Sequence, residues 1–391
     1  MTQYFIEHPE PMPVEVPEYE ELEPFFDWIC NLQENPEKDV QFKRGALLKG
    51  GHLDMCKQVV GPAHLYKLCE AVKKAGAKGF IEHYLMGNNI AFEFPENLNG
   101  KGAANATDGT RVEGINAMLE VMKPEYGIKT WYLAGNCINY EILDKMCSVL
   151  SDNDVCESLW LKRNPLGKQS DLHNTGIGDE GLIIMEKELS ENPPYSTKLK
   201  HLYLGANGIG LVGAKALKSI LKHFKETLET FMIDINRLGD EGIQELSSIL
   251  KECKNLKRLV VSSNGFTDKG MEIIENLAFE LPLLYLSVGF YKSTEVLGES
   301  YNKISNVSPI INIIENHPTI QLLNAEKCGL SKEETHRMIE ASKRKGGVSL
   351  YALQQIGFHI ENVIAHDSNQ LKIFRNDPIV DHIFSIYRNK M

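Results

Sequence analysis

The stretch LYLGANGIG, from Leu202 to Gly210, contains the pattern that decides the fold of this chain. Its frame is apolar-x-apolar-x-x-Asn-x-apolar, and the same frame occurs in LWLKRNPLG from Leu159, FMIDINRLG from Phe231 and LVVSSNGFT from Leu259. Fainter copies are HYLMGNNIA from His83, WYLAGNCIN from Trp131, LNAEKCGLS from Leu323 and LYLSVGFYK from Leu284. A pattern that recurs in this way indicates a repeat architecture.

The spacing of the Asn position indicates the length of the repeat. The positions are Asn88, Asn136, Asn164, Asn207, Asn236 and Asn264, followed by Gly289 and Cys328, at intervals of 48, 28, 43, 29, 28, 25 and 39 residues. The short intervals fit units of about 28 residues, and the long ones fit such units with insertions. Spacing and residue type together resemble the leucine-rich repeat of the ribonuclease-inhibitor type, over roughly residues 80–345. This resemblance implies an α/β horseshoe of about eight repeats, with a parallel β-sheet on the concave face and helices on the convex face.

Elementary physical chemistry supports the same repeat. Helix starts follow the turns at GDEG (178–181), GLVG (210–213), GDEG (239–242) and TDKG (267–270). Asp or Thr can cap a helix there, and carboxylates suit its positive end. Ile243, Leu246, Ile249 and Leu250 then keep helical spacing. The turn Asn is interpreted as structural, because its amide can bond backbone groups of adjacent turns that would otherwise be buried unpaired.

The flanks divide the chain further. We expect an extended, acidic and proline-rich arm over residues 1–24, followed by an N-terminal cap over 25–79 with a helix from His64 to Lys74. The solenoid is expected over 80–345 and a C-terminal helical cap over 346–391. The block FKRGALLKGGHLDMCKQVVGP, from Phe42 to Pro62, resembles one that precedes the repeats in Legionella-type leucine-rich-repeat effectors. That resemblance implies delivery into a host cell. The apolar spacing in DPIVDHIFSIYRNKM (377–391) predicts a capping helix, with a docking or export tail as the alternative.

Composition excludes several classes of function. The net charge is −11, yet residues 1–37 hold ten carboxylates and no Lys or Arg, so the remaining body is nearly neutral and unsuited to nucleic acid. No apolar run reaches the roughly 18–20 residues of a membrane helix, and no signal peptide is recognisable, so we expect a leaderless cytoplasmic protein. The eight cysteines lack the close spacing of zinc sites or disulfide frameworks, and we expect reduced, mostly buried thiols.

The residue between the two apolar strand positions should point onto the concave face, since strand side chains alternate. These residues are Tyr84, Tyr132, Trp160, Tyr203, Met232, Val260, Tyr285 and Asn324, of which five are aromatic. An exposed aromatic row is typical of a protein-binding surface. The predicted partner-binding residues are Tyr84, Tyr132, Trp160, Tyr203, Met232, Arg258 and Tyr285. Two alternatives remain open: aromatic residues favour strands in any case, and the acidic arm or a loop of the same chain could cover this face.

Searches for catalytic motifs find no P-loop, nucleophile elbow, zinc-protease helix or dinucleotide fingerprint. We therefore predict no enzyme, no metal and no cofactor, but a module that binds a partner protein, with a host protein as the partner implied by the effector resemblance. One alternative is an adaptor whose acidic arm or first helix recruits a ubiquitin ligase or similar enzyme. Another is a site on the edge formed by the insertions at 91–110, 167–177 and 292–303.

Overall fold

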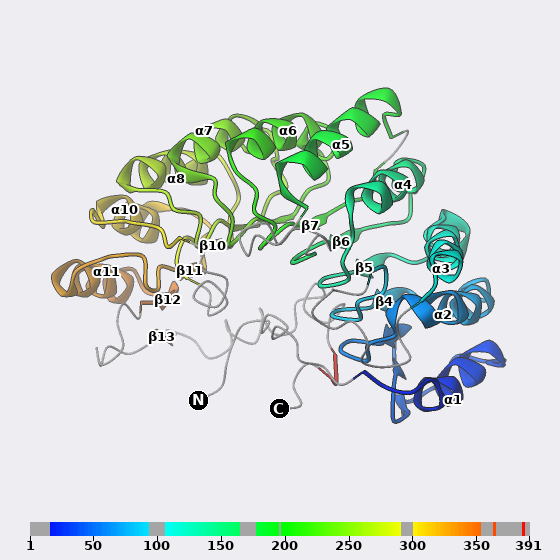
Figure 1. The fold of residues 1–391 in the computed structure, drawn as a ribbon. Coiled ribbons are helices and arrows are strands. Elements are labelled where there is room, and N and C mark those ends of the chain that lie inside the picture. Colours follow the sequence, from blue (N-terminus) through cyan, green and yellow to red (C-terminus); the bar gives the residue numbers. More distant parts are fainter. Residues whose placement is uncertain are drawn as a thin grey trace. The chain divides into compact units, whose positions relative to one another are not determined.

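The computed structural model describes residues 16–93, 106–164, 177–194, 197–290, 300–352, 363–364 and 385–387. Contacts between residues divide the chain into two compact units. The first unit holds strands β1 to β6 together with residues 385–387, and the second unit holds strands β7 to β13. Figure 1 shows that, within each unit, the helices lie along one side of the strands.

The first unit begins with a helix and a small antiparallel sheet. Helix α1 (Tyr19–Cys30) is followed by β1 (Val40–Gln41), β2 (Ala46–Leu48) and β3 (His52–Asp54), which pair in antiparallel order. Then come α2 (Gly61–Gly76), β4 (His83–Leu85), α3 (Asp108–Val121), the 3₁₀ turn η2 (Pro124–Tyr126), β5 (Thr130–Tyr132), α4 (Tyr140–Ser151) and β6 (Ser158–Trp160). Strands β3 to β6 are parallel neighbours in chain order.

The second unit repeats the strand, turn and helix. After α5 (Gly178–Glu191) it contains β7 (His201–Tyr203), α6 (Leu211–Leu221), β8 (Thr230–Met232), α7 (Gly239–Leu250), β9 (Arg258–Val260), α8 (Asp268–Phe279), β10 (Tyr285–Ser287), α10 (Ser308–Asn316), β11 (Leu322–Asn324), α11 (Lys332–Lys345), β12 (Ser349–Tyr351) and β13 (Val363–Ile364). Strands β7 to β12 are parallel in chain order, and β13 is antiparallel to β12. The predicted α/β solenoid class is confirmed.

The middle residue of each parallel strand belongs to the core. Strand register aligns Leu53, Tyr84, Trp131 and Leu159 in the first unit, and Leu202, Phe231, Leu259, Leu286, Leu323 and Leu350 in the second. None of these side chains is more than 5% exposed. Each repeat therefore buries its apolar strand position against its neighbours, as a stacked repeat must.

The turn Asn residues form the predicted ladder between repeats. Asn236 is representative: its Nδ2 donates to the carbonyl oxygens of Leu204 and Ile233, both at 3.0 Å. Its Oδ1 accepts from the backbone N–H groups of Asn207 at 3.1 Å and Ile209 at 2.9 Å. The side chain is fully buried, and it satisfies backbone groups of two successive turns. The structural interpretation of this Asn is confirmed.

Backbone conformation shows where the predicted frame was wrong. A residue with positive φ directly precedes most ladder residues: Asn88, Gly135, Arg163, Ala206, Ile235, Ser263 and Lys327. In the repeat at His83 the ladder residue is consequently Asn89, whose Nδ2 donates to the Met55 carbonyl oxygen at 2.6 Å. The predicted Asn88 instead occupies the left-handed position with φ 55°. The segment has two successive Asn residues, and Asn tolerates the left-handed region, so the sequence pattern alone fits both frames.

A second frame error lies at Gly289. Tyr285 pairs with Arg258, so the middle residue of β10 is Leu286 rather than Leu284, and the frame is shifted by two residues. Asn302 takes the ladder position, because its Oδ1 accepts from the Asn264 N–H at 2.8 Å and its Nδ2 donates to the Val288 carbonyl oxygen at 2.7 Å. An insertion separates this Asn from its strand, which hid it from a search at fixed spacing.

The repeat frame also occurs in the segments assigned to the caps. In the N-terminal segment, Gln58 occupies the turn position after β3, and its Nε2 donates to the Cys56 carbonyl oxygen at 2.9 Å. In the C-terminal segment, β12 continues the parallel series beyond residue 345. The fixed block from Phe42 to Pro62 thus contains the first strand and turn of the parallel series.

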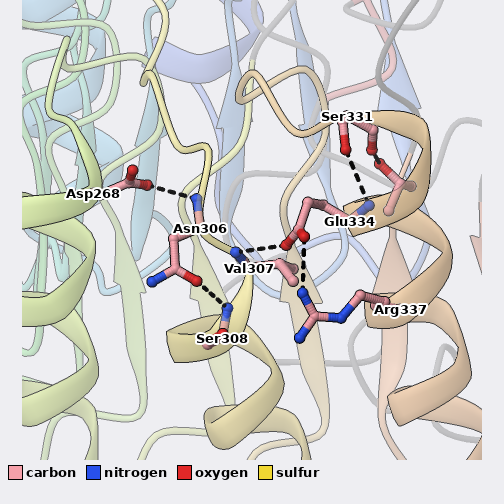
Figure 2. A network of polar contacts seen from close by, with 8 residues as sticks. Asp268, Asn306, Val307, Ser308, Ser331, Glu334 and Arg337 are labelled. Carbon is pink, nitrogen blue, oxygen red and sulfur yellow. Dashed lines mark hydrogen bonds and ion pairs between the residues drawn. The ribbon is translucent and has the colours of Figure 1, made fainter.

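Carboxylates at helix starts accept hydrogen bonds from the helix starts of neighbouring repeats. Asp240 Oδ1 accepts from the N–H groups of Thr267 at 2.8 Å and Gly270 at 2.9 Å, both at the start of α8. Asp179 does the same for α6. Figure 2 shows Asp268 bonded to the Asn306 N–H before α10, and Glu334 of α11 accepting from the Val307 N–H. The predicted cap residues are therefore used, but the Asp carboxylates bond across repeats.

The flanking predictions had mixed outcomes. The predicted helix from His64 to Lys74 lies within α2 and is confirmed. Helix α1 begins at Tyr19, so the extended arm predicted to residue 24 is wrong from there on, because buried Leu22, Phe25, Phe26 and Ile29 form one apolar face that outweighs Pro24. Residues 1–15 lie outside the described residues. So does most of the predicted C-terminal helix, of which residues 385–387 form a turn.

None of the helices in the described part of the chain is both long and apolar enough to cross a bilayer. All eight cysteines are described, none forms a disulfide, and seven are buried, as predicted.

Candidate functional site

The first and third residues of each parallel strand point away from the core row, onto a surface that we call the helix-free face. In the first unit the first positions hold His52, His83, Thr130 and Ser158, and the third positions hold Asp54, Leu85, Tyr132 and Trp160. In the second unit the first positions hold His201, Thr230, Arg258, Tyr285, Leu322 and Ser349. The third positions hold Tyr203, Met232, Val260, Ser287, Asn324 and Tyr351.

Most of the predicted partner-binding residues lie on this face. They are Tyr132 and Trp160 in the first unit, and Tyr203, Met232, Arg258 and Tyr285 in the second. Tyr285 stays on the face in spite of its frame error, because a shift of two residues preserves the side of a strand. Their role in binding a partner stays a prediction.

The prediction for Tyr84 is wrong. Tyr84 pairs with Trp131 in the core row, its ring centroid lies 5.1 Å from that of Trp131, and its side chain is completely buried beside Cys69 of α2. The one-residue frame error at Asn88 explains this outcome, because a shift of one residue moves every side chain of a strand to the opposite face. Leu85 is the residue of β4 that lies on the helix-free face at this position.

The aromatic residues of the helix-free face are not exposed, contrary to expectation. Tyr132, Trp160, Tyr203 and Tyr285 are 2%, 4%, 2% and 6% exposed, whereas Met232 and Arg258 are half-buried. In the first unit, Trp160 donates from Nε1 to Ser158 Oγ at 2.9 Å, and its ring lies 5.3 Å from that of Tyr132. Other atoms of the same chain therefore shield these rings.

In the second unit, Arg258 lies between an aromatic and a polar neighbour on adjacent strands. It pairs in register with Thr230 on one side and Tyr285 on the other. Burial lowers the pKa of its guanidinium, yet an arginine remains charged at physiological pH because its ordinary pKa is so high. Burial raises the pKa of the nearby Tyr203 hydroxyl, which therefore stays neutral. A half-buried cation beside tyrosine rings suits contacts with both carboxylates and aromatic groups of a partner.

The helix-free face of the first unit carries a contact that sequence reasoning missed. Asp54, at the end of β3, is fully buried and accepts at Oδ1 from the hydroxyl of Ser385 at 2.9 Å. Its Oδ2 accepts from the backbone N–H of Ile386 at 2.8 Å. Burial raises the pKa of the Asp54 carboxyl to about 6, although these hydrogen bonds oppose the rise. The available signal was a carboxylate between the apolar residues Leu53 and Met55.

The described residues offer little for catalysis. They contain no group of three or more His, Cys, Asp or Glu side chains placed to hold a metal ion. Burial raises the pKa values of Cys69, Cys137, Cys147, Cys156 and Cys253 to about 12. These thiols are therefore protonated near neutral pH and poor nucleophiles.

A hollow on the helix side of the second unit is a weaker candidate. It lies at α10 and α11, with Ile311, His336, Arg337 and Arg344 in its lining. Arg337 forms an ion pair with Glu334 at 2.8 Å, which Figure 2 shows, and Arg344 forms one with Glu315 at 2.6 Å. Its arginines are thus already paired within the chain.

Comparisons with known proteins define the class of these repeats. The family described as Leucine Rich repeat matches residues 195–218 and 252–274. "NACHT, LRR and PYD domains-containing protein 3" of Homo sapiens is 23% identical over 210 residues, covering 50% of this chain and 20% of that protein. "NACHT, LRR and PYD domains-containing protein 9" of Bos taurus is 24% identical over 323 residues, covering 74% and 32%. "RAN GTPase-activating protein 2" of Arabidopsis thaliana is 27% identical over 152 residues, covering 39% and 25%.

The chain thus contains leucine-rich repeats and is related to the repeat regions of those proteins. Leucine-rich repeats commonly mediate binding between proteins. The matched part is about a third or less of the length of each relative named here.

Proposed function

We propose that this chain is a protein-binding module that recognises a partner protein on the helix-free face of its second unit. The observation that carries the proposal is the set Tyr203, Met232, Arg258 and Tyr285, which adjacent strands β7 to β10 bring together on one surface. Tyr, Met and Arg are the residue types enriched at the centres of protein interfaces. Parallel strands lie only about 4.8 Å apart, so one partner segment can contact all four.

The burial of the two tyrosines decides how such binding would proceed. Tyr203 and Tyr285 are shielded within the chain, whereas Met232 and Arg258 are accessible. A partner would first contact the accessible pair and then replace the atoms that shield the rings. The affinity would then be the difference between the new contacts and the intramolecular ones, which favours a selective interaction.

The test is a comparison of partner capture by the wild-type chain and by the double variant Met232→Ala with Arg258→Ala. We expect the double variant to bind a captured partner at least about tenfold more weakly, because truncation of central interface residues costs upwards of about 1–2 kcal/mol. The matched control is Val212→Ala, which removes a 52% exposed apolar side chain from α6 on the helix side. Equal affinity for the wild type and the double variant would place binding elsewhere.

The resemblance of the block from Phe42 to Pro62 to Legionella-type effectors supports a finer proposal. In it, the partner is a host protein and the chain acts inside a host cell after delivery. Capture from eukaryotic and from bacterial lysates, with the same double variant as control, tests this choice. The adaptor alternative loses one route, because α1 buries Phe25 and Phe26 and cannot offer that apolar side to a ligase.

A further inference from the structure

The residues Ser385, Ile386 and Tyr387 make an ordered contact with a part of the chain that is remote in sequence. Ser385 and Ile386 both donate to Asp54, which lies 331 and 332 residues away. The Tyr387 hydroxyl donates to the carbonyl oxygen of Phe42 at 3.3 Å. All five residues that meet here belong to the first unit, so the contact is internal to one compact body.

The Asp54 carboxylate accepts hydrogen bonds from both a side chain and the main chain of this segment. The two carboxylate oxygens are used separately, one for a side-chain hydroxyl and one for a main-chain N–H. The Ser385 hydroxyl oxygen also accepts from the Tyr387 N–H at 3.2 Å, which fixes the turn of the segment. Hydrogen bonds to an ionised carboxylate are stronger than neutral ones, and the pair of donors is specific in its geometry.

The tyrosine supplies the apolar part of the contact. Tyr387 is 9% exposed and packs against Ala46 and Leu48 of β2, with Ile386 partly buried beside them. Ala46, Leu48 and Tyr387 thus form one small buried apolar cluster. Apolar burial and hydrogen bonding therefore come from the same three residues.

The bonds that hold the segment are of a kind that another peptide can reproduce. They include bonds to the Asp54 side chain and to the Phe42 carbonyl oxygen. If the segment leaves, the Asp54 carboxylate retains the Cys56 N–H at 3.1 Å but loses two donors. The loss of two donors leaves part of the carboxylate's hydrogen-bonding capacity unused, so the vacated surface favours a replacement that carries a hydroxyl, an N–H and an aromatic ring.

We propose that the surface formed by Phe42, Ala46, Leu48 and Asp54 is a peptide-binding site. Residues Ser385–Tyr387 are its intramolecular ligand. A partner segment that has a hydroxyl residue, an apolar residue and a tyrosine in succession competes with them for this site. This proposal rests on the proposed protein-binding function and adds a second, separately testable surface to it.

The probe for the test is a labelled synthetic peptide with the sequence of residues 378–391, added to the full-length chain. We expect the peptide to bind the Tyr387→Ala variant at least about tenfold more tightly than the wild type, because the variant weakens the intramolecular ligand. Adding Asp54→Asn to that variant should reduce peptide binding at least about tenfold. The control is Glu141→Gln, which changes an exposed carboxylate on α4 that pairs with Lys145 and should have no effect.

Peptide variants keep the test decisive if Asp54→Asn proves unstable. A peptide with its own Tyr387→Ala or Ser385→Ala change should lose binding to the unaltered Asp54 site. Equal binding of the peptide to the wild type and to Tyr387→Ala, or binding that ignores both peptide changes, would overturn the proposal. Because the probe is the chain's own segment, either result is independent of capture through Met232 and Arg258, so failure here leaves the proposed function standing.

Discussion

At the scale of single residues, the buried turn amide has the clearest energetic role. Asn236 replaces the water that four backbone groups would otherwise need, although the carbonyl oxygens of Leu204 and Ile233 also accept from the side chains of Asn207 and Asn264. We predict that Asn236→Ala lowers the free energy of unfolding by about 1–3 kcal/mol, because it leaves buried donors and acceptors unpaired. Denaturant titration measures this change. The exposed Asn255→Ala, which removes one bond to the Glu226 carbonyl oxygen, should change stability far less.

Asp54 should give the chain an unusual pH dependence. Its pKa rises from 3.8 to about 6 on folding, so between these values the folded state binds a proton that the unfolded state has released. Stability from this group is therefore present below about pH 4 and declines as pH rises towards 6, by up to about 3 kcal/mol. Most carboxylates in proteins show the opposite sign.

We predict that the stability of the wild type relative to Asp54→Asn falls by about 1–3 kcal/mol from pH 4.5 to pH 7. The difference between the two proteins cancels the titration of groups they share. Denaturant titrations at several pH values supply it, and a constant difference across this range would show that Asp54 has an ordinary pKa.

Several of these residue roles could be read from the sequence, and others could not. Asn136, Asn164 and Asn236 were identified correctly, because each stands alone at a fixed distance from its strand. Asn88 and Asn89 compete for one position, and only the backbone distinguishes the ladder residue from its left-handed neighbour. Asn302 was missed, since an insertion removes it from the spacing that the search relied on.

At the scale of elements, the starts of α6 and α8 depend on a neighbouring repeat. The N–H groups of the first helical turn have no partner within their own helix, and here a carboxylate from the preceding repeat accepts from them. Gly270 allows the close approach, because a Cβ atom at that residue would lie 2.7 Å from Asp240 Oδ1. The sequence predicted capping at these positions. It did not reveal that the Asp carboxylate caps the helix of the next repeat rather than its own helix.

We predict that Asp240→Ala destabilises the chain by about 1–2 kcal/mol, which is the usual cost of losing a helix cap. The change also removes the bond from Thr267 Oγ1 to Asp240 Oδ2 at 2.7 Å. Glu241→Ala is the matched control, since Glu241 is exposed in the same first turn. Equal losses in thermal unfolding for the two variants would assign the effect to the helix dipole rather than to the cap across repeats.

At the scale of the whole molecule, stability should be distributed by repeat. Contacts in a stack of repeats are made mainly between nearest neighbours, so a local defect need not reach distant repeats. We predict that Asn236→Ala speeds hydrogen exchange in β7 to β9 and their helices, while β3 to β5 in the first unit keep wild-type protection. Mass spectrometry of fragments can follow both regions. A uniform increase along the chain would indicate that the two units unfold as one.

The candidate site shows where sequence reasoning ends at this scale. Alternation along a strand predicts which side chains share the helix-free face, and it succeeded for Tyr132, Trp160 and Tyr203. It does not predict what lies over that face. The hydrogen bond between Ser385 and Asp54 joins residues that are 331 positions apart, and no repeating sequence pattern indicates it.

The left-handed residue before most ladder positions has a consequence for engineering and for evolutionary tolerance. Gly135 takes this conformation at no steric cost, whereas Ala206 and Ile235 adopt φ values of 55° and 57°. For a residue with a Cβ atom the conformation costs about 1 kcal/mol, although glycine also gains freedom in the unfolded chain. The left-handed conformation therefore lowers the free energy of unfolding slightly at several successive turns. Replacing these residues by Gly or Asn, one repeat at a time, is expected to raise the stability of the chain.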